Sequence, residues 1–428
     1  MTHIAIIGGG WAGLAAGVAL ADAGVRVTVF EASKSLGGRA RRVEVDGRSL
    51  DNGLHILIGA YRDTLALMQR VAPGITTFRR LPLTLEIADR FRLACPRLPA
   101  PLHLLAGLAT ARGLGLGDRM AAARLMLGQR LGGFRGRAGE TVAALLERLR
   151  QPPRNREFLW HPLCIAALNT PPETADAQVF LNVIRDGLDG PAGASDLVLP
   201  AIDLGAMFPE PAAAFIAARD GEVRTACAVK SVERGSDAFI VQSATGEDTF
   251  THVICATDPA RGATLLEGLP GLAALAGTLG GLRYLPIVSI YLQYAPTVRL
   301  PTPMVGFRGG PAQWAFDRGA LCAQSGLIGT VASAATDIDR TPAAALAAAV
   351  DAQLRRHFHD LPVPEWHQVI TERRATFACV PGMPRPPQRT DMPRFYLAGD
   401  YTRSEYPATL EAAVRSGLAC AHAVLEDR

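Results

Sequence analysis

Four residues near the N-terminus have the types and the spacing that bind a dinucleotide. Gly8, Gly10 and Gly13 follow a short apolar run, and Glu31 comes eighteen residues after the last of them. The first glycine permits a tight turn, the second lets the backbone approach a pyrophosphate, and the third lets a helix pack closely on a sheet. A carboxylate at Glu31 can accept hydrogen bonds from ribose hydroxyls. The pattern predicts a bound nucleotide cofactor; a glycine-rich turn without a ligand and a site for NAD(H) are the alternatives.

Three elements must hold these residues in place. Residues 4–7 form an apolar run, rich in isoleucine, that suits a strand buried on both faces. Residues 11–23 are rich in alanine and favour a helix that Gly24 ends, and residues 25–30 make a second strand. The first N–H groups of that helix point at the phosphates. The cofactor contacts predicted from this unit are Gly8, Gly10, Trp11, Ala12, Gly13, Glu31 and Ala32.

Further motifs lie far along the chain. Leu36-Gly37-Gly38-Arg39 follows the acid, and Asp51-Asn52-Gly53 lies in an extended segment. Leu397-Ala398-Gly399-Asp400 precedes the helical stretch 407–425, and residues 226–232 around Val229 read as a strand. Together with the glycine fingerprint, these motifs resemble the FAD-dependent amine oxidase and phytoene desaturase superfamily.

This resemblance implies a fold and a cofactor. It implies an α/β protein with a discontinuous Rossmann-like FAD-binding domain, an α+β substrate domain and a helical subdomain. Asp400 would face the FAD ribityl and pyrophosphate, and Val229 would clamp adenine through its backbone. The last helix would present its N-terminus to the flavin, where it stabilises negative charge on the reduced ring. Covalent attachment is not expected, because Cys420 lies too far along this helix. The resemblance adds the cofactor residues Gly38, Arg39, Gly53, Leu54, His55, Val229, Gly399, Asp400, Thr409 and Leu410.

Longer stretches resemble one subfamily, the squalene-associated FAD-dependent desaturases, also called hydroxysqualene dehydroxylases, of bacterial hopanoid pathways. These stretches are residues 50–62, 160–171 and 194–200, and the subfamily more often has glutamine where this chain has Leu54. The resemblance implies that reduced FAD helps convert hydroxysqualene to squalene, a long isoprenoid. Loss of the hydroxyl needs an acid, and the catalytic candidates are Asp51 and His55. Alternatively, Asp51 braces its loop and His55 is a buried structural histidine.

Several other interpretations stay open at this point. The flavin can instead act oxidatively, as in a carotenoid-type desaturase or an amine oxidase. An amine oxidase usually needs an aromatic cage, for which Tyr401 and Tyr406 are candidates. A prenyl-binding escort protein is an alternative of another class, although an escort would not need the complete set of FAD motifs. Trp160, His161 and Tyr61 either line a substrate tunnel or only pack. Residues 169–172 are either a helix stop or a substrate contact.

Composition excludes several classes of protein. The net charge of +4 is small, and no strongly basic stretch carries interleaved aromatics, so nucleic acid is not an expected partner. The seven cysteines are scattered and odd in number, which argues against a disulfide framework or a metal site and suits a reducing cytoplasm. No signal peptide and no apolar run long enough to cross a bilayer are recognised. We expect a cytoplasmic protein, either soluble or peripheral at the inner membrane face.

The chain divides into alternating blocks. Residues 1–75, 205–262 and 385–428 are assigned to the FAD-binding domain, and residues 76–204 and 263–384 to the substrate domain. Within the latter, residues 97–150 are helical. Their first part, residues 97–137, combines apolar residues with six arginines in its helices and has Asp118 as its only acid. This composition suits a helix in a membrane interface. In the alternative, these helices cover a tunnel. Besides the membrane, an upstream squalene-pathway enzyme is a candidate partner.

Overall fold

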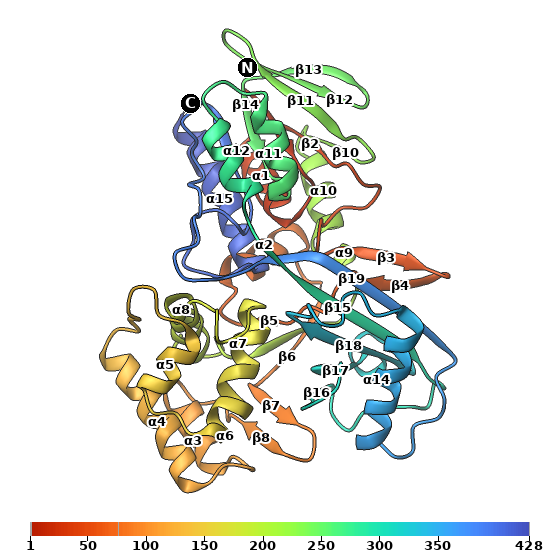
Figure 1. Ribbon diagram of the computed structural model, residues 1–428. Coiled ribbons are helices and arrows are strands. Elements are labelled where there is room, and N and C mark those ends of the chain that lie inside the picture. Colours follow the sequence, from red (N-terminus) through yellow and green to blue (C-terminus); the bar gives the residue numbers. More distant parts are fainter. Residues whose placement is uncertain (1, 76, 428) are drawn as a thin grey trace.

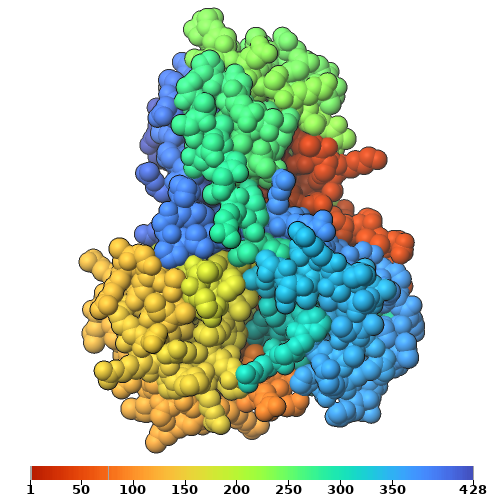
Figure 2. All heavy atoms as spheres, in the orientation of Figure 1, coloured from red at the N-terminus to blue at the C-terminus, as the bar shows by residue number. Residues whose placement is uncertain are grey.

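The computed structural model describes residues 2–75 and 77–427, which form three lobes. Figure 1 shows a parallel-sheet lobe at the top, a helical lobe at the lower left and an antiparallel-sheet lobe at the lower right. Figure 2 shows the same three lobes as close-packed masses. Both chain termini lie in the parallel-sheet lobe, so this lobe is built from segments that are far apart in the sequence.

A five-stranded parallel sheet is the centre of the upper lobe. Its order is β10 (Glu222–Arg224), β2 (Arg26–Phe30), β1 (His3–Ile7), β14 (His252–Cys255) and β20 (Phe395–Leu397). Ile4 and Ile6 point into the core on the side of the helices α1 (Trp11–Asp22), α10 (Pro209–Ala217) and α15 (Leu410–Glu426). Ala5 and Ile7 point into the core on the opposite side. The central strand is therefore buried on both faces, as its apolar sequence predicts.

The second face of this sheet is covered by a small antiparallel sheet. It consists of β11 (Val229–Arg234), β12 (Phe239–Ser243) and β13 (Gly246–Phe250). The helices α11 (Pro259–Glu267) and α12 (Ala273–Gly280) pack together beside β11. Layers of helix and sheet around a parallel sheet are the α/β arrangement predicted from the sequence.

Seven strands form the sheet of the lower right lobe. In order they are β19 (Trp366–Phe377), β15 (Tyr284–Gln293), β18 (Leu327–Ser333), β17 (Trp314–Asp317), β16 (Met304–Gly306), β7 (Thr84–Ile87) and β8 (Phe91–Ala94). The helix α14 (Ala343–His357) packs against β15 and β19. The paired strands β15 and β19 run diagonally from this lobe toward the parallel sheet and link the two (Figure 1).

Shorter elements complete the chain. The helical lobe contains α3 (Leu102–Thr110), α4 (Leu116–Leu131), α5 (Val142–Arg148), α6 (Pro153–Asn155), the π-helical turn η1 (Arg156–Trp160), α7 (His161–Leu168) and α8 (Ala177–Leu188). The remaining elements are β3 (Arg42–Val45), β4 (Arg48–Asp51), β5 (Leu57–Ile58), α2 (Arg62–Val71), β6 (Phe78–Leu81), β9 (Leu197–Pro200), α9 (Leu204–Met207) and α13 (Arg318–Cys322). Within the described chain, no helix has both the length and the apolar character that crossing a bilayer requires.

Two sequence-based boundaries differ from the structure. The strand expected over 226–232 begins only at Val229, because Ala226 has a positive φ and its N–H bonds to the Ser33 carbonyl instead of joining a ladder. The boundary placed between residues 262 and 263 cuts through α11. Since α11 and α12 pack together, residues 263–280 lie with the parallel-sheet lobe instead of with the antiparallel sheet.

Candidate functional site

One cavity of about 450 Å³ extends from the glycine fingerprint to the antiparallel-sheet lobe. Every cofactor residue predicted from the sequence lines it except Gly13. These lining residues are Gly8, Gly10, Trp11, Ala12, Glu31, Ala32, Gly38, Arg39, Gly53, Leu54, His55, Val229, Gly399, Asp400, Thr409 and Leu410. The fold thus brings motifs from both ends of the chain and from its middle to a single cavity.

The glycine turn leaves space where a phosphate would lie. A Cβ built on Gly10 would find its nearest described neighbour, the Gly38 Cα, at 3.8 Å, so the backbone here faces an open cradle. Gly10 also begins α1, and no side chain among the described residues caps that helix start. Uncapped N–H groups at a helix N-terminus bind anions. The cradle therefore fits a pyrophosphate.

The other two glycines are needed for packing. A Cβ on Gly13 would lie 2.0 Å from the Gly8 carbonyl oxygen, and one on Gly8 would lie 2.5 Å from the Ala256 carbonyl oxygen. Gly8 also has a φ of +117°, which side chains rarely adopt. Gly13 is outside the cavity for this reason: it allows α1 to pack closely on the turn, which is the role that the fingerprint predicts.

Glu31 is held rigidly at the end of β2. Its Oε2 accepts a hydrogen bond from the Gly9 N–H and its Oε1 accepts one from the Ser33 N–H, both at 2.8 Å. Each carboxylate oxygen can accept a second hydrogen bond, so the carboxylate can still receive ribose hydroxyls. The backbone bonds set the direction in which the carboxylate faces.

Val229 lines the cavity at the start of β11, and its carbonyl is already engaged. The Arg261 Nη2 donates to the Val229 carbonyl, and also to the Lys230 carbonyl at 3.3 Å. Arg261 itself lines the cavity. Sequence reasoning missed this arginine, because nothing in its neighbourhood marks it and its partner lies more than thirty residues away.

Arg39 and Asp400 join the N-terminal and C-terminal motifs directly. Arg39 Nη2 lies 2.7 Å from Asp400 Oδ1, and Arg39 Nη1 donates to the Ala375 carbonyl of β19 at 2.7 Å. The helix α15 starts just beyond, where Thr409 Oγ1 accepts from the Ala412 N–H at 3.1 Å. Leu410 and Ala413, on the first turn of α15, line the cavity. The positive end of this helix therefore faces the cavity, where it favours negative charge.

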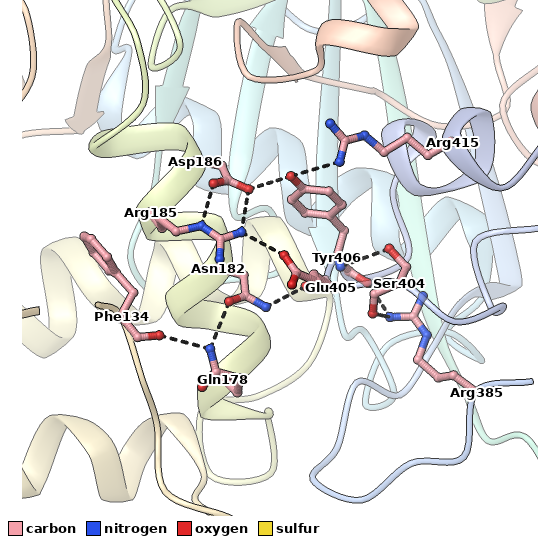
Figure 3. A network of polar contacts seen from close by, with 10 residues as sticks. All are labelled: Phe134, Gln178, Asn182, Arg185, Asp186, Arg385, Ser404, Glu405, Tyr406 and Arg415. Atoms are coloured by element: carbon pink, nitrogen blue, oxygen red, sulfur yellow. Dashed lines mark hydrogen bonds and ion pairs between the residues drawn. The ribbon is translucent and has the colours of Figure 1, made fainter. Parts of the chain in front are cut away.

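A polar network fixes the loop that leads into α15. Figure 3 shows Tyr406 directed at Asp186 of α8, with Arg415 on its other side. Arg185 pairs with Glu405 at 3.0 Å, and Asn182 donates to the Glu405 carbonyl. On the side facing away from α8, Arg385 donates to the carbonyls of Asp400, Ser404 and Tyr406. The loop that carries the flavin motif is thereby clamped against the helical lobe.

This network bears on the aromatic cage considered for an amine oxidase. Tyr401 lines the cavity, but the Tyr406 side chain is turned toward Asp186 and lies outside it. The two tyrosines therefore do not face each other across the cavity. The cage that those two residues would have made is not formed.

The far wall of the cavity is mostly apolar. It is contributed by α7, β15, β18, β19, the segment 54–61 and the loop before α15, and its apolar members are Leu54, Ile56, Ala166, Ala167, Ile287, Val331 and Ala408. Its polar members beyond the predicted set are Tyr61, Asn169, Ser333, Glu372 and Thr376. Two residues whose roles the sequence leaves open belong to this wall. Tyr61 lines the cavity. Asn169 ends α7 with a left-handed backbone and also lines the cavity. Trp160 is buried and donates to Gln151 instead.

Asp51 does not reach this cavity. Its Oδ2 lies 2.8 Å from Arg318 Nη1, its Oδ1 accepts from the Leu204 N–H at 2.8 Å, and its carbonyl accepts from the Tyr291 Oη. The carboxylate is thus the ion-pair partner of a buried arginine. The expectation that Asp51 donates a proton to a substrate is not supported by this geometry, because both of its oxygens are engaged and the residue does not line the cavity.

His55 does line the cavity. Its Nδ1 lies 2.8 Å from the Gly53 carbonyl, which fixes the ring orientation. Burial lowers the pKa of His55 below its usual 6.5, although the hydrogen bond to Gly53 opposes that shift. The neutral ring donates through Nδ1 and leaves Nε2 as an acceptor. Of the two catalytic candidates, His55 alone is positioned to meet a bound molecule.

Comparison with known proteins agrees with this site. Residues 11–425 match the family described as "Flavin containing amine oxidoreductase". The chain belongs to the flavin-containing amine oxidoreductases. It is an FAD-dependent oxidoreductase, and FAD is its cofactor, which fits the open cradle at Gly10 and the helix ends that face the cavity. Among the described residues, no group of three or more His, Cys, Asp or Glu is arranged to hold a metal ion.

Individual proteins are similar to this flavoenzyme over its length. The hydroxysqualene dehydroxylase of Rhodopseudomonas palustris is 29% identical and is aligned over 98% of this chain and 97% of its own. The 15-cis-phytoene desaturase of Solanum lycopersicum is 26% identical over 99% of this chain and 78% of its own. A solved oxidoreductase from Methanosarcina mazei has a TM-score of 0.78 at 17% identity, covering 99% of this chain and all of that one, and so shares the fold.

Proposed function

We propose that this flavoenzyme converts hydroxysqualene to squalene by reductive dehydroxylation. The observation that carries the proposal is a cavity whose far wall, beyond the flavin motifs, is mostly apolar. The apolar residues of this wall suit a hydrocarbon, and the carboxylate in it, Glu372, already accepts from the Asn52 side chain at 3.1 Å and from the Arg374 N–H at 3.2 Å. The similarity to a hydroxysqualene dehydroxylase across almost the full length of both chains supports the same substrate class, an isoprenoid alcohol.

The reaction removes the hydroxyl group and replaces it with hydrogen. The carbon–oxygen bond breaks, the oxygen takes a proton and leaves as water, and the carbon takes a hydride. Bound FAD, once reduced, supplies that hydride. The apolar wall formed by Ala166, Ala167, Ile287 and Val331 holds the hydrocarbon and excludes water, which would otherwise recapture the positively charged carbon.

His55 is the proton donor in this proposal. Hydroxide is a poor leaving group, so a side chain must protonate the departing oxygen. The hydrogen bond from Nδ1 to Gly53 orients the ring, and when the ring is doubly protonated its Nε2 can donate. Tyr61 is a second polar group of the cavity, and burial raises its pKa so that its phenol stays protonated. It can therefore hydrogen-bond the same oxygen.

Delivery of the substrate follows from its low solubility. A long isoprenoid alcohol does not diffuse freely in water, so it must pass to this enzyme from a lipid phase or from the enzyme that makes it. We therefore propose a peripheral attachment at the inner membrane face and an upstream squalene-pathway enzyme as a partner.

Anaerobic single turnover tests the proposed reaction. The purified protein is reduced until its flavin is bleached, hydroxysqualene is added in detergent, and flavin reoxidation is followed together with squalene formation. We expect both signals, in equal amounts. If neither appears, the proposal is wrong.

The similarity to a phytoene desaturase favours one second candidate, an oxidative desaturation. In that case the oxidised enzyme would bleach on addition of phytoene, and the reduced enzyme would not respond to hydroxysqualene. The two outcomes are opposite in the direction of electron flow, so one pair of experiments separates them.

A further inference from the structure

The helix α4 carries an apolar stripe on its solvent-facing side. Of the eight large apolar side chains that are exposed in the described chain, six lie between residues 98 and 131. Four of them, Leu116, Met120, Leu127 and Leu131, belong to α4 and are between 41% and 90% exposed. At about 100° per residue, these four and the exposed Arg124 fall within about 80° of the helix circumference. We call these five residues the α4 face.

The α4 face does not include the side of the helix by which α4 packs against the rest of the protein. The inward side of α4 buries Ala121, Ala122, Leu125, Met126 and Gln129. The helix is also tied to its neighbour, because Arg119 donates to the carbonyls of Ala109, Ala111 and Leu114 at the end of α3. The α4 face is therefore held rigidly outward on a helix about 24 Å long. A soluble helix normally presents polar residues on that side, and a contiguous apolar patch marks an interaction surface.

The charges around the α4 face are positive. Arg97, Arg112 and Arg124 are exposed and form no ion pair with any of residues 2–75 or 77–427. Asp118, the only acid in residues 97–137, accepts from the Gly115 N–H at the start of α4 and so serves as its cap. Apolar side chains beside unpaired arginines are the combination that an anionic bilayer surface binds.

We propose that the α4 face docks on an anionic lipid bilayer, with Leu116, Met120, Leu127 and Leu131 inserted among the lipids and Arg112 and Arg124 at the headgroups. A second copy of this chain fits less well, because a two-fold contact would bring Arg124 against its own symmetry mate. Only the purpose of the docking, which is the uptake of an apolar substrate, rests on the proposed function. The surface itself is defined without reference to the reaction.

A continuous run of helices leads from this surface to the wall of the cavity. Asn155 of α6 donates to the Asp118 carbonyl at 2.8 Å, so α6 packs on the start of α4. The chain continues from α6 through η1 into α7, whose residues Ala166 and Ala167 line the cavity. Figure 1 shows these helices together in the helical lobe, at the opposite end of the molecule from β11–β13. A molecule entering from the bilayer at α4 would meet the helices that lead to the apolar wall.

Flotation with vesicles tests the docking without turnover. The holoenzyme is mixed with vesicles of phosphatidylcholine alone, or of equal parts phosphatidylcholine and phosphatidylglycerol. We expect flotation with the anionic vesicles. The triple variant Leu116→Gln, Leu127→Gln, Leu131→Gln should bind them roughly 10- to 100-fold more weakly, and Arg112→Glu with Arg124→Glu roughly tenfold or more. The matched control is Val363→Gln, which replaces an equally exposed apolar residue outside the helical lobe and should bind like the wild type.

Three results would overturn the docking. The first is a wild type that floats with neither vesicle, and the second is a triple variant that floats as well as Val363→Gln. The third is a wild type that is dimeric and binds no vesicles, together with a triple variant that is monomeric. This result would identify the surface as a contact between copies. Unchanged flavin absorbance and thermal unfolding show that the variants are folded. Turnover of hydroxysqualene in detergent is measured separately, so loss of the reaction and loss of docking are distinguished.

Discussion

Asp51 Oδ2 lies 2.8 Å from Arg318 Nη1, and both side chains are almost completely buried. This pair joins the end of β4 to the start of α13 in the antiparallel-sheet lobe, 267 residues away. Tyr291 Oη bonds to the Asp51 carbonyl from β15 and strengthens the same junction. These contacts join β4 to the antiparallel-sheet lobe, and we propose a structural role for Asp51.

Breaking this buried pair should cost stability and leave the chemistry in place. We expect Asp51→Asn to lower the free energy of unfolding by about 3–5 kcal/mol, because it leaves the Arg318 guanidinium buried without a counter-charge. Turnover per folded, flavin-loaded molecule should change less than about threefold, since one pKa unit or one hydrogen bond at the reacting atoms would cost more. Denaturant unfolding and single-turnover kinetics measure the two quantities.

An exposed ion pair supplies the control. Arg70 pairs with Asp22 at 2.6 Å on the surface, and Asp22→Asn should change the free energy of unfolding by less than about 1 kcal/mol. If Asp51→Asn unfolds like this control but abolishes turnover, the assignment of Asp51 as a structural residue is wrong and a catalytic role returns.

The cradle at Gly10 makes a second prediction. Gly10→Ala adds a methyl group that meets no described atom within 3.8 Å, at a backbone φ of −77° that alanine accepts. We expect the free energy of unfolding of the cofactor-free protein to change by less than about 0.5 kcal/mol. The methyl group would occupy the space of the pyrophosphate, so FAD affinity should fall by roughly tenfold or more. Fluorescence titration with FAD measures the affinity.

Gly417 is the contrasting glycine. A Cβ there would lie 2.1 Å from the Ala12 carbonyl oxygen, where α15 crosses α1. Gly417→Ala should therefore destabilise the protein itself by about 1–3 kcal/mol through overpacking. Equal FAD affinity for Gly10→Ala and the wild type would show that the pyrophosphate does not lie over Gly10.

The sequence predicts the parts of this site whose residues lie close together along the chain. It predicts little of what depends on contacts between distant segments. The glycine fingerprint and Glu31 are fixed by turns within one βαβ unit, so their positions could be predicted from spacing, whereas Gly38 and Arg39 came from the family resemblance. Arg261 and Arg318 could not, because each acts on a partner in another block of the chain, and only the fold brings the two together. The sequence leaves the catalytic and the bracing roles of Asp51 both open for the same reason, because its buried partner Arg318 lies in another block of the chain.

Tyr406 provides a test of the clamp on the flavin loop. Tyr406→Phe removes the hydrogen bonds to Asp186 and Arg415 while it keeps the ring. We expect a loss of about 1–3 kcal/mol in the free energy of unfolding, since hydrogen bonds to charged groups are among the stronger ones. FAD should also dissociate faster, because the loop leads into α15. Glu405→Gln, at an exposed pair with Arg185, should have little effect. Identical flavin release from both variants would mean that Tyr406 does not hold the loop.

His55 should make both stability and rate depend on pH. Burial lowers its folded pKa below 6.5, so the unfolded chain binds the proton more readily, and stability falls as the pH drops below about 6.5. His55→Gln does not titrate and should lose less stability over that range, while the other histidines titrate in both proteins. If His55 donates the proton, the single-turnover rate above its pKa should fall about tenfold per pH unit, following the protonated fraction. The variant should show a low, flat profile. Parallel pH–rate profiles for the two proteins would exclude His55 as the donor and direct attention to Tyr61.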